Sequence, residues 1–174
     1  MISKIIKKFN PKYPQSLQKI YQFKQNYPQT LKNVYNTKMD KNIYGKKLKN
    51  CSYNNIAKTG YNRNGFCTNI NQDQGSHQIC LNINPENTTH NFCLITGQPN
   101  WCAEKSPCHQ NLNMNCNKKE WCVCNGQFNN AINKIGCDAF DIDCEATNIS
   151  ALEDFRKNPQ YQKALECIKK KCKV

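Results

Sequence analysis

The first fifty residues of this 174-residue chain contain no cysteine, no arginine and a single acidic residue, Asp40. Twelve lysines give the same segment a net charge of +11, out of a formal +13 for the whole chain. All thirteen cysteines lie at or after Cys51. These absences divide the chain into a basic arm, residues 1–40, and a cysteine-rich globular domain, residues 41–174.

Long hydrophobic runs are also lacking. No apolar stretch approaches the ~20 residues that a membrane-spanning helix requires, and the apolar part of residues 1–10 is too short for a secretory signal. The arm is basic like a mitochondrial presequence, but such presequences are normally rich in arginine. We therefore expect the chain in the cytoplasm or in a virion assembled there, with a mitochondrial location disfavoured.

Apolar residues are scarce as well, since they make up 38% of the chain with cysteine included. A single domain with so little to bury needs covalent or metal cross-links, which the cysteines can supply. Cytosolic thiols are normally reduced. Three states of these cysteines therefore remain as alternatives, namely disulfides, bound zinc and reduced buried thiols. Because thirteen is odd, at least one thiol has no disulfide partner within the chain.

The chain contains no Cys-x-x-Cys pair, the spacing typical of zinc ribbons and thiol redox sites. Disulfides are therefore the preferred interpretation, and we expect no cofactor. Zinc remains the alternative, with His109 and the cysteines at 93, 102, 108, 116, 122 and 124 as candidate ligands. The candidates for disulfide bonds are Cys51, Cys67, Cys80, Cys93, Cys102, Cys108, Cys116, Cys122, Cys124, Cys137, Cys144, Cys167 and Cys172.

A repeat with a period of fourteen residues occupies the arm, where residues 13–21 read YPQSLQKIY and residues 27–35 read YPQTLKNVY. The apolar residues of each copy fall on one helical face, and the proline suits a first helical position. We predict two short helices, which at this length are marginal alone in water and require a surface to lie on. The residues predicted to bind a partner are Tyr13, Leu17, Ile20, Tyr21, Tyr27, Leu31, Val34 and Tyr35, with Lys7, Lys8, Lys12 and Lys19.

That surface is either the globular domain itself, with the lysines solvated, or another protein. Lysine interleaved with tyrosine also fits nucleic acid, through phosphate neutralisation and base stacking. The missing arginines weaken this alternative, because bidentate arginine contacts are typical of specific phosphate and base recognition. We favour other protein subunits of a large assembly as the partners.

In the globular domain the pattern predicts an α+β fold, with a short, mainly antiparallel sheet and flanking helices. Alternating residues predict strands over 78–84, 121–124 and 142–147. We expect three helices. One covers 127–134, the second begins at a capping box formed by Ser150 and Glu153, and the third begins at residues 158–159.

His77 is the best candidate for chemistry, because Gly75 just before it allows a ligand to approach closely. Arg63 and Asp73 are near it in sequence, and we take Arg63 and His77 as a possible ligand site. The alternative is a hydrogen-bonded histidine in a turn. No nucleophile or metal partner completes a catalytic constellation, so we assign no catalytic residue and no metal site.

Seven short motifs, in chain order, resemble the pattern of the uncharacterised domain of unknown function family numbered 2237, over about residues 33–155. They are NV at 33–34, KNCS at 49–52, TGYNRNGFC at 59–67, GSHQIC at 75–80, WCVC at 121–124, EATN at 145–148 and ALED at 151–154. The resemblance implies no known activity. Asn148 stands where the family usually has histidine, and residues 85–120 diverge from its pattern.

The resemblance also divides the cysteines. Five match family positions, namely Cys51, Cys67, Cys80, Cys122 and Cys124. The other eight look added, and eight cysteines can form four additional disulfides.

We expect a nonenzymatic structural component of a large assembly, such as a minor capsid protein of a virion, stapled by disulfides and anchored through its arm. One alternative is a nucleic-acid-associated protein that binds through the arm. Another is a redox or ligand-binding domain that depends on cysteine or zinc.

Overall fold

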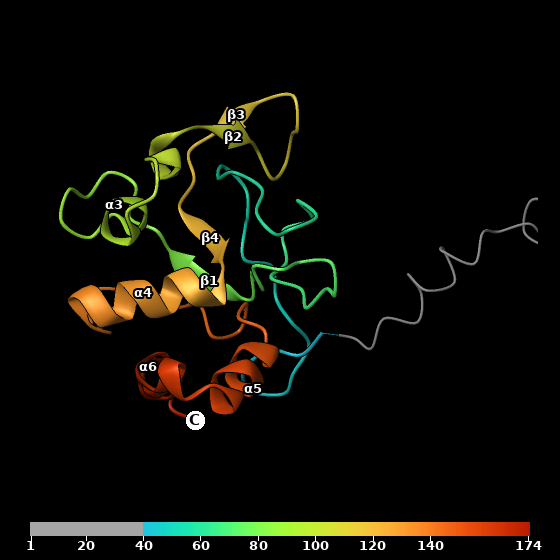
Figure 1. The fold of residues 1–174 in the computed structure, drawn as a ribbon. Coiled ribbons are helices and arrows are strands. Elements are labelled where there is room, and N and C mark those ends of the chain that lie inside the picture. The colour runs from blue at the N-terminus through green and yellow to red at the C-terminus, as the bar shows by residue number, and fades with distance from the viewer. Residues whose placement is uncertain (1–39) are drawn as a thin grey trace, which may run out of the picture. The chain divides into compact units, whose positions relative to one another are not determined.

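A two-stranded antiparallel ribbon is the central element of the computed structural model, which describes residues 40–174 (Figure 1). Strand β1 (Ile79–Asn82) pairs with β4 (Glu120–Val123), and Cys80 lies opposite Cys122 in the register. A second, smaller sheet pairs β2 (Ser106–Pro107) with β3 (Asn115–Cys116).

The two faces of the β1–β4 ribbon are covered in different ways, because successive side chains in a strand point to opposite faces. Ile79 and Leu81 belong, with Trp121 and Val123, to the main apolar core. Cys80 and Cys122 belong to a separate buried cluster with Cys51, Cys67 and Ala146. One face of the ribbon therefore packs in the main apolar core, and the other packs in the cysteine cluster.

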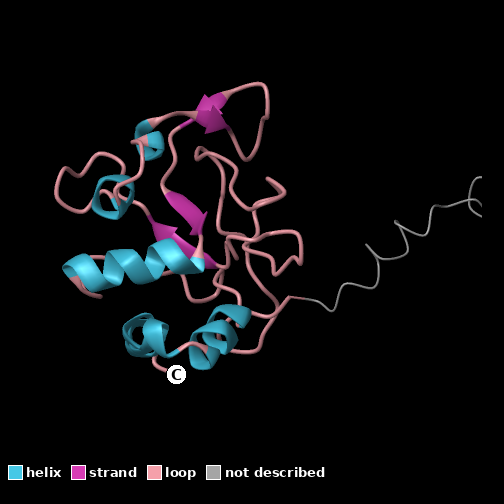
Figure 2. Cartoon of the chain, in the orientation of Figure 1, coloured by secondary structure: helices cyan, strands magenta, loops and turns pink. Residues whose placement is uncertain are grey.

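Four α-helices and two 3-10 turns supply the rest of the main core (Figure 2). The helices are α3 (Phe92–Thr96), α4 (Asn125–Ile135), α5 (Ser150–Lys157) and α6 (Gln162–Cys172), and the turns span Trp101–Ala103 and Pro159–Tyr161. Helix α4 contacts both α3 and α6, and α5 contacts α6. Between these elements four phenylalanines are fully buried, namely Phe92, Phe128, Phe140 and Phe155.

Local capping explains why α3 can be only five residues long. The Asn91 side chain accepts hydrogen bonds from the backbone N–H groups of Cys93 and Leu94. At the other end Gly97 adopts φ 74°, a left-handed conformation that glycine reaches without steric cost. None of the helices within residues 40–174 is long and apolar enough to cross a membrane.

The α+β fold predicted from the sequence is confirmed, as are the strands near 78–84 and 121–124 and the helix near 127–134. The predicted strand over 142–147 is wrong, because only Ile142 forms a bridge, to Leu81. The capping box is also wrong, since Ser150 is the first residue of α5 and makes no side-chain cap bond. The arm helices predicted at 13–21 and 27–35 lie outside the described residues.

Six disulfides cross-link the domain, and they respect the division of the cysteines into two sets. The family-like set forms Cys51–Cys80 and Cys67–Cys122. The eight added cysteines pair only among themselves, as Cys93–Cys102, Cys108–Cys116, Cys137–Cys167 and Cys144–Cys172. Cys124 is free, which corrects its place among the disulfide candidates.

The added disulfides hold two parts of the chain. Cys93–Cys102 and Cys108–Cys116 fasten the divergent segment 85–120, which has little regular structure of its own. Cys137–Cys167 and Cys144–Cys172 tie α6 to the loop that follows α4. Four of the residues predicted as zinc ligands are bonded in two of the added disulfides, Cys93–Cys102 and Cys108–Cys116. A zinc site that uses these four cysteines would require both disulfides to be reduced.

The disulfide pattern predicts how many thiols react with an alkylating reagent. Denatured, non-reduced protein should take up one label per chain, on Cys124, and reduced protein should take up thirteen. Intact mass spectrometry counts the labels, and peptide mapping locates the single one. Several labels on non-reduced protein would contradict the six cross-links.

Candidate functional site

A cavity of about 570 Å³ opens beside the ribbon, and residues from distant parts of the chain line it. Arg63 comes from the turn before Cys67, His77 lies two residues before β1, and Trp121 lies on β4. Trp101 and Lys118 come from the divergent segment 85–120. A volume of this size is typical of small-molecule sites.

A tight turn at Gly60 places Arg63 at the cavity. The Gly60 carbonyl accepts hydrogen bonds from Arg63 N at 2.9 Å and from Arg63 Nη1 at 3.1 Å. Gly60 has φ 92°, and a Cβ there would lie 2.5 Å from the Phe66 carbonyl oxygen, so glycine is required. Arg63 itself has φ 49°, a strained value that the turn imposes on a non-glycine residue.

Lys118 comes from the segment that precedes β4 and is buried beside the indole of Trp121. Only 5% of the residue is exposed. Its Nζ donates hydrogen bonds of 2.8 Å to the carbonyls of Trp101 and Glu104. The ammonium has three donors, so these two bonds leave one available.

The two cations share an aromatic neighbour. The Arg63 guanidinium lies 4.9 Å from the Trp121 ring centroid, and Lys118 Nζ lies 5.6 Å from it and 5.7 Å from that of Trp101. The two indoles are 5.9 Å apart and tilted by 46°. Both distances to Trp121 fall within the range of cation–π attraction.

Neither cation has a carboxylate within ion-pair distance among residues 40–174. Burial lowers the pKa of Arg63, and it also lowers the pKa of Lys118, where the nearby Arg63 charge acts in the same direction and Glu104 opposes it. Desolvated charge that lacks a counterion is costly, and such groups concentrate at functional sites.

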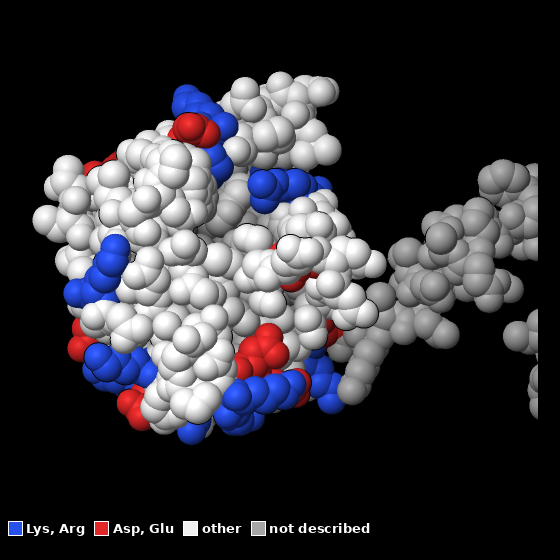
Figure 3. Space-filling view, viewed as in Figure 1, with Lys and Arg blue, Asp and Glu red and all other residues white. Residues whose placement is uncertain are grey.

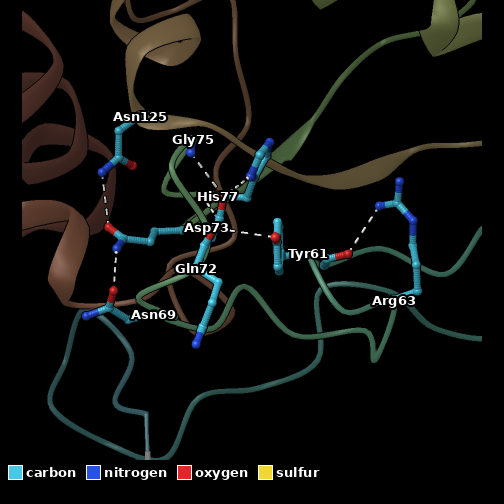
Figure 4. A network of polar contacts seen from close by, with 10 residues as sticks. Tyr61, Arg63, Asn69, Gln72, Asp73, Gly75, His77 and Asn125 are labelled. Carbon is cyan, nitrogen blue, oxygen red and sulfur yellow. Dashed lines mark hydrogen bonds and ion pairs between the residues drawn. The ribbon is translucent and has the colours of Figure 1, made fainter.

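His77 is held at the edge of the cavity by Asp73 (Figure 4). The buried Asp73 carboxylate contacts His77 Nδ1 at 2.7 Å and accepts the His77 backbone N–H at 2.7 Å. A Cβ on Gly75 would lie 2.6 Å from His77 Cε1, so the glycine permits this packing. Tyr61 stacks on the imidazole with ring centroids 6.5 Å apart.

The structure therefore brings Arg63 and His77, the two residues predicted as a possible ligand site, to one cavity. It also makes His77 a hydrogen-bonded histidine in a turn, which was the alternative interpretation, while the ligand site stays a prediction. An adjacent amide network supports the start of β1, where Gln78 accepts from Asn125 and donates to Asn69 (Figure 4).

A second cavity of about 590 Å³ lies at the N-terminus of α4, and the free thiol of Cys124 lines it. Burial raises the pKa of this thiol, although backbone N–H groups at the helix start oppose the shift. Since the thiolate is the reactive form, a raised pKa does not suit a redox nucleophile.

The surface charge in the view of Figure 3 is mixed in sign. Basic and acidic residues lie side by side along the lower edge of this view. Lys170 of α6 pairs with Asp138, in the loop that follows α4, at 2.8 Å. The visible face thus carries no extended basic patch of the kind expected for nucleic acid.

Residues 41–162 match one protein family, described as "Uncharacterized protein conserved in bacteria (DUF2237)". The chain belongs to the DUF2237 family. The match begins later than the predicted residue 33 and continues past 155, which leaves the motif at 33–34 outside it. No curated protein matches the chain.

Three of the motifs that resemble DUF2237 meet at the cavity. TGYNRNGFC supplies Arg63, GSHQIC supplies His77, and WCVC supplies Trp121. Sequence reasoning missed Trp101 and Lys118, which come from outside the motifs. Composition offered one signal for Trp101, because the chain has only two tryptophans and both line this cavity.

The lowered pKa of Lys118 predicts a pH dependence of stability. Between the folded-state pKa and the ordinary lysine value of 10.5, the unfolded chain retains a proton that the folded chain releases. The free energy of unfolding should therefore rise with pH across this window, and Lys118→Met should remove that increment.

Urea unfolding from pH 7.5 to 10.5 measures the effect, with Cys124→Ser in both proteins to prevent thiol–disulfide exchange. The pH slope is the readout, because the substitution also removes hydrogen bonds to two carbonyls and changes the absolute stability. Parallel curves for the two proteins would contradict the lowered pKa.

Proposed function

We propose that the globular domain is a nonenzymatic binding module that takes a small anionic ligand with a planar group. The observation that carries the proposal is the pair of cations, Arg63 and Lys118, which adjoin Trp121 without a carboxylate partner among the described residues. An anionic ligand would supply the missing counterion and recover part of the desolvation cost.

The side chains define the ligand class. A guanidinium binds carboxylate and phosphate oxygens in a bidentate manner, and the remaining Lys118 donor adds a further contact. The two indoles offer apolar faces for a ring to stack on. Since Asp73 occupies His77 Nδ1, the other ring nitrogen, Nε2, remains for a polar group of the ligand.

The absence of a nucleophile near the histidine supports a binding role over catalysis. Within residues 40–174, no serine, threonine or cysteine side chain hydrogen-bonds to His77. Ser52 does contact His109 Nδ1 at 3.0 Å, but Ser52 is fully buried and a substrate could not reach it.

Tryptophan fluorescence should report ligand binding directly, because both tryptophans line the cavity. Benzyl phosphate combines the expected charge and ring, and we expect it to shift the emission in a saturable way. Arg63→Ala should weaken binding about 10- to 100-fold, the range for a lost charge-assisted hydrogen bond of about 1.5 to 3 kcal/mol.

Arg156→Ala is the matched control, because Arg156 is the only other arginine and lies exposed on α5. It should leave the affinity unchanged. Inorganic phosphate and benzyl alcohol separate the contributions of charge and ring. Equal binding of benzyl alcohol and benzyl phosphate would refute anion recognition at this cavity.

A second candidate function is a structural component of a large assembly, such as a virion formed in the cytoplasm, with the arm as the anchor. The segregation of charge favours it, because residues 1–50 carry +11 of the formal +13. The arm repeat offers apolar stripes at Leu17, Ile20, Leu31 and Val34 for protein subunits, and its lysines offer contacts for nucleic acid.

Two arm variants distinguish these partners in gradient sedimentation of lysates from cells that produce the chain. If the stripes dock on protein, serine at Leu17, Ile20, Leu31 and Val34 should release the 20.2 kDa chain from fast-sedimenting particles. Glutamine at Lys7, Lys8, Lys12 and Lys19 is the charge control and should leave it there. Release by the glutamine variant or by nuclease would favour nucleic acid, and wild-type protein that sediments as a monomer would refute the assembly role.

A further inference from the structure

The disulfides Cys51–Cys80 and Cys67–Cys122 lie against each other in one buried cluster. The sulfur atoms of Cys51, Cys67 and Cys80 lie within 4.8 Å of one another, and Cys122 is bonded to one of them. All four residues are at most 2% exposed. Three of the four sulfurs therefore lie close together, and the fourth, on Cys122, lies outside this group but is bonded to the Cys67 sulfur.

We propose that, when these two disulfides are reduced, the four cysteines form a tetrathiolate site for one Zn²⁺ ion. Zinc binds four cysteine thiolates tetrahedrally at about 2.3 Å, which places the sulfurs about 3.8 Å apart. Cα atoms 5.6 and 5.3 Å apart in the two bonded pairs let the sulfurs separate to that distance by small side-chain rotations.

The chemistry balances with a dithiol or a phosphine as the reductant. Each disulfide accepts two electrons and two protons, while a dithiol becomes a disulfide or a phosphine becomes its oxide with an oxygen from water. Zinc then binds the four sulfurs as thiolates, and their four protons pass to solvent.

The frame that carries these sulfurs is fixed by contacts other than the disulfides. Cys80 and Cys122 are register partners in the β1–β4 ribbon. Their backbone N–H groups donate to the buried hydroxyls of Thr147, at 3.0 Å, and of Thr59, at 2.8 Å. Cys51 N donates to the Gly65 carbonyl at 2.8 Å. These bonds orient three of the ligands when the sulfurs are separated.

Charge also favours the site. Zinc with four thiolates carries a net charge of −2, which is costly to bury without compensation. Cys122 lines the same cavity as Arg63 and Lys118, which form no ion pair with a carboxylate of residues 40–174. Positive groups nearby stabilise thiolates over thiols.

The site is specific to the family-like cysteines. Across residues 40–174, the sulfurs of Cys51, Cys67 and Cys80 form the one group of three or more histidine, cysteine or acidic side chains that is close enough to share a metal ion. The added disulfides are separate pairs, so their reduction gives ordinary thiols. The domain core is thereby fastened by disulfides in an oxidising compartment and by zinc in a reducing one.

Cobalt(II) tests the site, since tetrahedral tetrathiolate coordination gives intense visible d–d absorption. The full chain is reduced with a phosphine under anaerobic conditions with Co²⁺ present throughout. We expect one equivalent of Co²⁺ per chain with this absorption, and its loss when Zn²⁺ is added. Cys67→Ser should abolish the tetrathiolate spectrum, while the control Cys93→Ser/Cys102→Ser should retain it.

Alkylation of the reduced, zinc-loaded protein locates the ligands. Relative to the same reduced chain without metal, zinc should slow the labelling of Cys51, Cys67, Cys80 and Cys122 and leave the labelling of the other nine cysteines, Cys124 among them, unchanged. A zinc-dependent decrease in the labelling of other cysteines, or uptake of Co²⁺ by Cys67→Ser equal to that of the wild type, would refute the proposal. A reduced wild-type chain that binds no metal would refute it as well.

Discussion

The pairing of β1 with β4 is the constraint on which the rest of the domain depends. A two-stranded ribbon is at best marginally stable by itself in water, so both of its faces need support. Ile79 and Leu81 bury one face against the helices, and Cys80 and Cys122 anchor the other face through disulfides to the preceding loops. The chain thus compensates for its low apolar content by cross-linking the face that has no helix to pack against.

A rigid ribbon also makes the unfavourable features of the cavity tolerable. Arg63 has a positive φ, Lys118 is buried without a carboxylate partner among the described residues, and Ser76 next to His77 has φ 49°. Strained and desolvated groups persist only where the surrounding structure holds them in place. Here Thr59 bonds the turn of Arg63 to the Cys122 backbone, and Asp73 fixes His77. The stability gained at the ribbon therefore offsets costs that are concentrated at one cavity.

The sequence predicted those elements whose pattern is local. Alternation marked β1, and helical periodicity marked α6. The start of α5 was expected from a capping box, which does not form. The strand expected over 142–147 failed because the Thr147 hydroxyl bonds the Cys80 backbone N–H and a turn replaces the ladder. At the site, Arg63 and His77 stood out within short motifs, but Trp101 and Lys118 did not. Their positions depend on the path of residues 85–120, which two disulfides determine. Because the pairing of cysteines cannot be deduced from their spacing, this path could not be predicted from the sequence.

The separation of the two cysteine sets bears on what the added disulfides do. Because no disulfide joins a family-like cysteine to an added one, the added pairs fasten segments onto a frame that closes by itself. Trp101 immediately precedes Cys102 of one added pair, and Lys118 follows Cys116 of another by two residues. These two pairs hold the side of the cavity that the DUF2237-like motifs do not supply. The motifs therefore build the ribbon and the Arg63 side of the cavity, while the added disulfides fix the side that carries Trp101 and Lys118.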